Sequence, residues 1–363
     1  MMRVFRWLRY WPDWSGYAAA LWSLLYGAAG LYWALGGGGY PFAKVSPGRS
    51  GLSVLEPSRA EVVAPVIAVL GLAGAVAGVL MARGHGHGRA RYALLGFGWL
   101  QAVTLALVLP DYTLIGILAL WPVLLVFCFT GVPGPQQTIG NVIFWHRENL
   151  IIIFLGGLLW AAATLAYQRR TGGHCVRCGR GGRAAGAWTR PEAALRWGRW
   201  AVRVAVVSTL PYEITRLAWY FGYPLGITRA FEADMQHTPH LLEIGLCLGL
   251  ASLGGSLLTH GLVSGWGEVW PRWVWWKAGR PVHPATAIVP ASTVAVVLIP
   301  GGLMMARAGL SADMWGTNGP GILWIVWGAA LGAATLAYHL RRRGSCRHCG
   351  LGAPAVEPEC VLV

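Results

Sequence analysis

Long apolar runs alternate with short polar loops along most of the chain. A helix needs about 20 predominantly apolar residues to cross a bilayer, so we expect each run to form one membrane-spanning helix. The expected crossings lie near residues 15–36, 61–82, 92–110, 148–168, 199–221, 241–262, 284–306 and 320–339. The pattern predicts an all-α, polytopic membrane protein with eight crossings.

One further apolar run, residues 113–129, follows Pro110 and Asp111 and changes the count if it also crosses. Loops rich in arginine stay on the cytoplasmic side of a membrane. Eight crossings place the arginines near the N-terminus and in residues 83–91 in the cytoplasm, whereas nine crossings place them outside. We therefore expect residues 113–129 to form a re-entrant or interfacial element, with nine crossings as the alternative.

The chain also contains an internal repeat. The segment TLAY occurs at residues 164–167 and again at 335–338, and CxxCG occurs at residues 175–179 and again at 346–350. Both offsets are 171 residues (335 − 164 and 346 − 175), so the copies align without a gap. With four crossings in each copy, we expect two parallel repeats related by a pseudo-two-fold axis along the membrane normal.

Composition agrees with a lipid environment and excludes one class of partner. Hydrophobic residues make up 55% of the chain, charged residues 12%, and the mean hydropathy is +0.51. The net charge of +15 lies in short loops and not on a free basic face, so nucleic acid is not an expected partner. The arginine-skewed composition suggests a bacterial cytoplasmic membrane. The expected organisation is a first repeat (1–182), an amphipathic cytoplasmic linker (183–200), a second repeat (201–351) and a C-terminal tail (352–363).

The two CxxC knuckles carry the strongest chemical signal. Together they supply the four thiolates of a closed structural zinc site, and the glycine after each pair suits a tight turn. The predicted ligands are Cys175, Cys178, Cys346 and Cys349. The four crossings of the second copy place both knuckles and the C-terminus on one face, and the arginine-rich loops beside the knuckles, including Arg169 and Arg341, assign that face to the cytoplasm. Stable disulfides are rare there. The alternatives are a redox CxxC, two independent sites completed by His174 and His348, and thiols without a ligand.

Charged residues within the apolar runs are the next candidates. Glu213 and Arg216 stand at i and i+3 of one expected helix, so they share a face, and Pro211 interrupts the backbone hydrogen bonding beside them. Such groups mark a ligand or proton site or form an ion pair that only serves packing. Glu61 and Glu243 occupy matching positions in the two copies, and His240 lies in an acidic loop expected on the outer side; these three are further ligand candidates.

Parallel repeats and a charged pair beside a proline favour a permease-like carrier for a small molecule or an ion. A membrane scaffold or a zinc or thiol redox sensor is the first alternative. A membrane-embedded enzyme acting on a lipid or isoprenoid substrate, with Glu213, His240 and Glu243 as its polar groups, is the second. An enzyme is the less favoured reading because no paired-carboxylate or histidine-rich signature completes such a site.

Overall fold

The computed structural model describes residues 10–44, 53–119, 144–181, 186–238 and 240–352. These residues form helices and no strand. The chain divides into two compact units, Met1–Ala184 and Ala185–Val363. Each unit is described by itself below.

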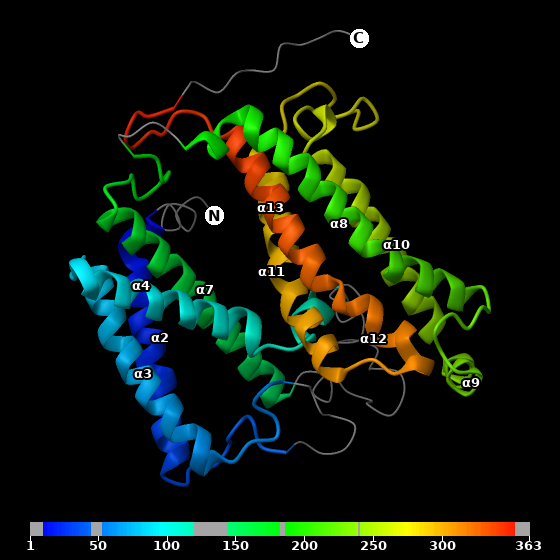
Figure 1. The fold of residues 1–363 in the computed structure, drawn as a ribbon, viewed down its shortest axis with the longest axis horizontal. Helices are drawn as coiled ribbons and strands as arrows, with labels where there is room; N and C mark the ends of the chain where they lie inside the picture. Colours follow the sequence, from blue (N-terminus) through cyan, green and yellow to red (C-terminus); the bar gives the residue numbers. More distant parts are fainter. Residues whose placement is uncertain (1–9, 45–52, 120–143, 182–185, 239, 353–363) are drawn as a thin grey trace. The chain divides into compact units, whose positions relative to one another are not determined.

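The described part of the first unit forms four long helices (Figure 1). They are α2 (Trp11–Ala34), α3 (Ala60–Ala82), α4 (Gly88–Val103), which continues into a π-helical turn at Thr104–Val108, and α7 (Trp145–Thr171). α7 packs against both α2 and α4. Its buried indole, Trp160, donates a hydrogen bond from Nε1 to Oγ of Ser23 on α2, at 3.1 Å. The core of this unit therefore lies along α7.

Small residues let α2 and α3 approach at backbone distance. A methyl group added at Gly71 of α3 would lie 2.7 Å from the carbonyl oxygen of Ser23 and closer still to Cα of Gly27, both on α2. Two turns on, a methyl at Gly78 would lie 2.9 Å from Cβ of Ala20. Lipid provides no hydrophobic driving force for membrane helices to associate. Close approach through small residues provides van der Waals packing energy instead.

The second unit also consists of packed helices (Figure 1). They are α8 (Pro191–Tyr220), α9 (Arg229–His237), α10 (Leu241–Gly261), α11 (Pro284–Ala308), α12 (Trp315–Ile322) and α13 (Trp324–Arg342). Short 3-10 turns lie at Ala187–Thr189, Gly265–Gly267 and Ala312–Met314. α8 packs against α10 and α13, and α13 also packs against α11. Pro191 opens α8 at a position where a missing N–H costs nothing, and Pro211 lies inside the same helix without ending it.

Among the described residues, six helical segments are long and apolar enough to cross a membrane. They are Ala60–Ala82, Gly88–Val108, Trp145–Thr171, Leu241–Gly261, Pro284–Ala308 and Ala312–Arg342. α2 and α8 form helices of 24 and 30 residues at two further expected crossings but fall outside this set. Residues 113–119 of the extra apolar run are helical, and residues 120–129 lie outside the described part.

The last long helix of each unit makes the same capping contact. Nη1 of Arg170 on α7 donates to the carbonyl oxygen of Ala82, at the end of α3, at 2.7 Å. Arg341 on α13, 171 positions later (341 − 170), donates from Nη2 to the carbonyl oxygen of Leu262, at the end of α10, at 2.6 Å. The final carbonyls of a helix have no partner within it, so each arginine satisfies one. The repeated arginines thus have a packing role inside their own units as well as a charge.

Candidate metal centre

The first CxxC knuckle follows directly on the C-terminal end of α7. The N–H of Cys175 donates to the carbonyl oxygen of Arg180 at 2.7 Å, and the N–H of Gly179 donates to the carbonyl oxygen of Cys175 at 2.8 Å. The N–H of Arg180 also lies 3.5 Å from Sγ of Cys178. Gly179 has φ of +72°, a conformation that only glycine adopts at little cost. The glycine predicted to permit the turn therefore does so.

The second knuckle repeats this hydrogen-bond pattern. The N–H of Cys346 donates to the carbonyl oxygen of Leu351 at 3.0 Å, and the N–H of Gly350 donates to the carbonyl oxygen of Cys346 at 2.8 Å. Gly350 has φ of +71°. Each knuckle is therefore a closed turn held by its own backbone.

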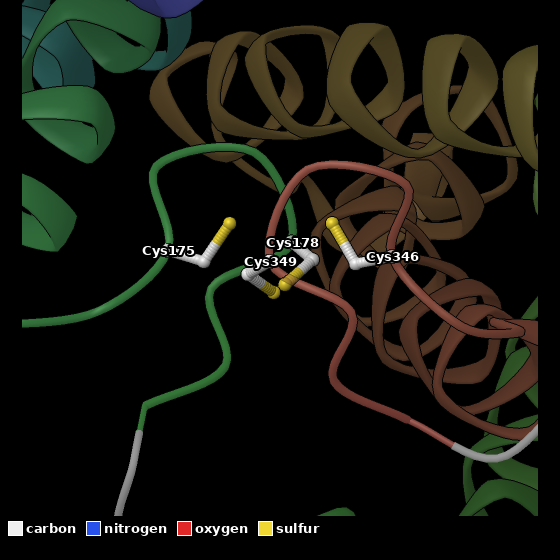
Figure 2. Close-up of side chains that lie close together, drawn as sticks. All are labelled: Cys175, Cys178, Cys346 and Cys349. Carbon is white, nitrogen blue, oxygen red and sulfur yellow. The ribbon is translucent and has the colours of Figure 1, made fainter.

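The four cysteine sulfurs come together. Their Sγ atoms all lie within 4.8 Å of one another, and the four residues are half-buried. Figure 2 shows the four side chains converging from the two knuckle loops. None of the four cysteines is in a disulfide. Sulfurs around a tetrahedral ion at about 2.3 Å lie about 3.8 Å apart, so the thiols approach the spacing that such an ion requires.

A positive side chain supports the first knuckle. Nη1 of Arg169 donates to the carbonyl oxygens of Val176 at 3.0 Å and of Arg177 at 3.1 Å. Groups that hydrogen-bond around the ligands orient a metal site, and a guanidinium close by offsets the charge of thiolates. The sequence showed Arg169 only as a marker of topology; nothing in the pattern linked it to the cysteines.

The histidines expected in the alternative sites do not join this group. Among the described residues, the cluster of potential metal ligands consists of the four cysteines and includes neither His174 nor His348. Tetrahedral sites of four sulfur ligands hold zinc or iron. The donor set thus fits a metal ion that prefers sulfur ligands.

Glu213 lies in the seam between α8 and α10. The side chain is buried, and its Oε1 accepts hydrogen bonds from Oγ of Ser252 at 3.1 Å and of Ser256 at 3.2 Å. The hydroxyls of Ser256 and Thr209 are 2.8 Å apart, which extends the network back to α8. Hydroxyl groups, not a cation, therefore satisfy this carboxyl group.

Arg216 takes a different environment one turn further along α8. The structure describes both residues and gives no ion pair between Arg216 and Glu213. The guanidinium carbon lies 4.6 Å from the ring centre of Tyr212 and 4.2 Å from that of Trp219. Its Nη1 is buried and has no hydrogen-bond partner. The two charged residues share a helix but not a contact.

The remaining predicted candidates are exposed. Glu61 and Glu243 lie in the first turns of α3 and α10, where a negative charge favours the helix dipole. His240 precedes α10 with φ of +62° and is exposed. None of the three belongs to a group of potential metal ligands in the described part of the chain.

The structure adds one buried polar pair that sequence reasoning missed. Nε2 of His146 lies 3.4 Å from Oε2 of Glu56, with only 3% and 6% of the two side chains exposed. Nδ1 of the same histidine lies 2.6 Å from the carbonyl oxygen of Pro41. These residues are about a hundred positions apart and belong to no motif, so no pattern could have paired them.

The fold and the cysteines together define a helical protein with membrane-type segments and a four-thiol cluster able to bind a metal ion. Comparison with protein-family models, with curated proteins and with solved structures finds no match. Any assignment of function therefore depends on the residues themselves.

Proposed function

We propose that the chain is an integral membrane protein in which Cys175, Cys178, Cys346 and Cys349 bind one structural zinc ion, and that it acts as a permease-like carrier for a small molecule or an ion. The convergence of the four thiols supports the zinc site. A closed site of four cysteines leaves no coordination position for a substrate, so the ion has a structural role. It would clamp the ends of the two repeats.

The carrier function is supported by the polar groups inside α8. Glu213 is buried in α8, the helix that also contains Pro211. Its carboxyl group accepts hydrogen bonds from two hydroxyl groups of α10. An ionisable group in such a place is expensive and commonly serves a substrate or proton path. We propose eight crossings in two parallel repeats, in a bacterial cytoplasmic membrane, with the knuckles and the C-terminus in the cytoplasm as the arginine distribution favours.

Elemental analysis of the detergent-purified full chain tests the zinc site. We expect one zinc per chain in the wild type, and loss of zinc in both Cys175→Ser and Cys346→Ser. Cys247→Ser is the matched control, because this cysteine is exposed and stands outside the cluster. Iron in place of zinc would show that the four cysteines bind iron and not zinc. An absence of metal together with pairwise oxidation of the thiols would favour the redox-sensor alternative instead.

Flux into proteoliposomes tests the carrier function. The probes are a defined panel of small organic anions, neutral solutes and monovalent cations, followed with an entrapped pH or ion indicator. We expect protein-dependent flux of at least one probe, lost in Glu213→Gln and kept in Glu243→Gln, which changes an exposed carboxylate of the same unit. If every probe crosses no faster than through empty liposomes, the carrier proposal fails and a scaffold or sensor role replaces it.

A further inference from the structure

A cavity of about 280 Å³ opens within the second unit, among α8, α9, α10 and α12. Its wall is mainly apolar and includes the rings of Tyr212, Trp219 and Phe231. Among the described lining residues, Arg216 is the one basic side chain, and Thr317 contributes a hydroxyl group. The volume lies just below the usual range of pockets that enclose drug-sized ligands, about 300–1,000 Å³, so a small molecule suits it.

The guanidinium of Arg216 has no counter-ion in the described unit. The nearest acid along α8, Glu213, is occupied by the hydroxyls of Ser252 and Ser256. Tyr212 and Trp219 cover the guanidinium through ring contacts at 4.6 and 4.2 Å, and Nη1 stays buried without a hydrogen-bond partner. A guanidinium presents its N–H donors in a planar fork that matches a carboxylate or phosphate. The cavity wall thus combines one unneutralised positive charge with apolar surface.

The cavity lies at the far end of α8 from the knuckle of the same unit. A Cβ at Gly198 would lie 2.7 Å from Cβ of Ala337, so the start of α8 packs closely against the end of α13, which leads into that knuckle. Arg216 is 18 residues further along α8 (216 − 198), or about 27 Å at 1.5 Å per residue. This distance is close to the thickness of a hydrocarbon core, about 30 Å. The cavity therefore lies near the end of α8 that is distant from the knuckle of the same unit.

We propose that this cavity is a binding site for a small organic carboxylate. The carboxylate group pairs with the guanidinium of Arg216, and the apolar part of the ligand packs against Phe231 and the neighbouring rings. Because the wall has one cation, we expect the ligand to have a single negative charge. Because the rest of the wall is apolar, we expect the rest of the ligand to have no further polar groups. The proposal that this ligand is the transported substrate rests on the carrier function proposed above. The proposal that the cavity binds the ligand does not require transport.

Isothermal titration of the full chain in a neutral detergent tests the site without flux. The probe is 3-phenylpropionate, and 3-phenylpropionamide is its uncharged counterpart. We expect the carboxylate to bind and the amide to bind at least about tenfold more weakly, since a hydrogen-bonded charge pair is worth about that factor or more. Binding in detergent without flux in liposomes would support the site and refute only the carrier function.

Three variants make the test specific. Arg216→Gln should weaken binding about tenfold or more. Gly245→Leu should do the same while keeping the charge, because a Cβ at this cavity position would lie 3.8 Å from Cδ of Arg216 and a longer side chain fills the space. Gly245→Leu also keeps the proposal testable if Arg216→Gln does not fold. Arg229→Gln, whose side chain is 88% exposed, should bind as the wild type does.

Several outcomes would overturn the proposal. Equal affinity for the carboxylate and the amide would show that the charge of Arg216 has no role in binding. Unchanged binding in both Arg216→Gln and Gly245→Leu would place the ligand elsewhere. Retention of phosphatidylglycerol that depends on Arg216, without any binding of 3-phenylpropionate, would assign the cation to a lipid headgroup instead.

Discussion

Gly71→Ala tests whether backbone contact between α2 and α3 holds the first unit together. The added methyl group would lie 2.7 Å from the carbonyl oxygen of Ser23, whereas ordinary contact begins at 3.4 Å. The helices must therefore separate by at least 0.7 Å (3.4 − 2.7). Overpacking of this kind costs about 1–3 kcal/mol. The higher helix propensity of alanine returns about 0.5–1 kcal/mol. From the middle of each range, we expect a net loss of about 1 kcal/mol.

Gly96→Ala is the matched control for this substitution. Gly96 lies inside α4, is exposed, and a methyl there would meet no described atom within 4 Å. The same chemical change should therefore leave stability unchanged or raise it slightly. The assay is tryptophan fluorescence during heating and during titration with a denaturing detergent, on both purified variants. A Gly71→Ala midpoint equal to or above that of Gly96→Ala would refute the packing argument.

Three further predictions concern the polar contacts and the metal. Ser256→Ala removes one of the two donors to buried Glu213, and we expect a stability loss of about 1–3 kcal/mol in the same fluorescence assay. Tyr338→Phe removes the 2.8 Å hydrogen bond to the carbonyl oxygen of Gly267 and should cost about 1 kcal/mol by the same measurement. A strong zinc chelator should lower the thermal midpoint of the wild type but not that of Cys346→Ser; equal shifts in both would refute a metal-dependent effect.

The positions of the helices could be predicted closely where the apolar run itself sets the length. The expected crossings at 61–82 and 284–306 correspond to α3 at Ala60–Ala82 and α11 at Pro284–Ala308. A bilayer demands a minimum length, and a helix is the element that satisfies its own backbone there. α8 shows the limit of this reasoning. It begins at Pro191, eight residues before the expected crossing at 199, because an amphipathic stretch can continue the same helix outside the apolar run.

The sequence pattern could not determine whether Glu213 and Arg216 form an ion pair, whereas their contacts in the folded structure do. A spacing of three residues places two side chains on one helix face, and on that basis the sequence left an ion pair open. In the structure, Glu213 reaches the hydroxyls of α10, and Arg216 lies over aromatic rings. The environment of Glu213 depends on residues of α10 that only packing brings to it. The rings beside Arg216 lie at i − 4 and i + 3 of the same helix, so helical spacing alone brings them within reach. Helical periodicity predicts which residues can meet, but neighbouring elements determine which of them do.

In the knuckles, by contrast, residues that are close in the sequence determine nearly all of the local geometry. The turn at Cys346 closes through backbone hydrogen bonds within six residues, and Gly350 supplies the conformation that the turn needs. Arg341 holds the helix end before this turn through the carbonyl oxygen of Leu262 and through Oε1 of Glu268, at 2.8 Å. Each thiol pair is therefore positioned by backbone hydrogen bonds within its own unit. The proposed zinc ion would therefore bind turns that are already closed, unlike the ion of a zinc finger, which drives folding.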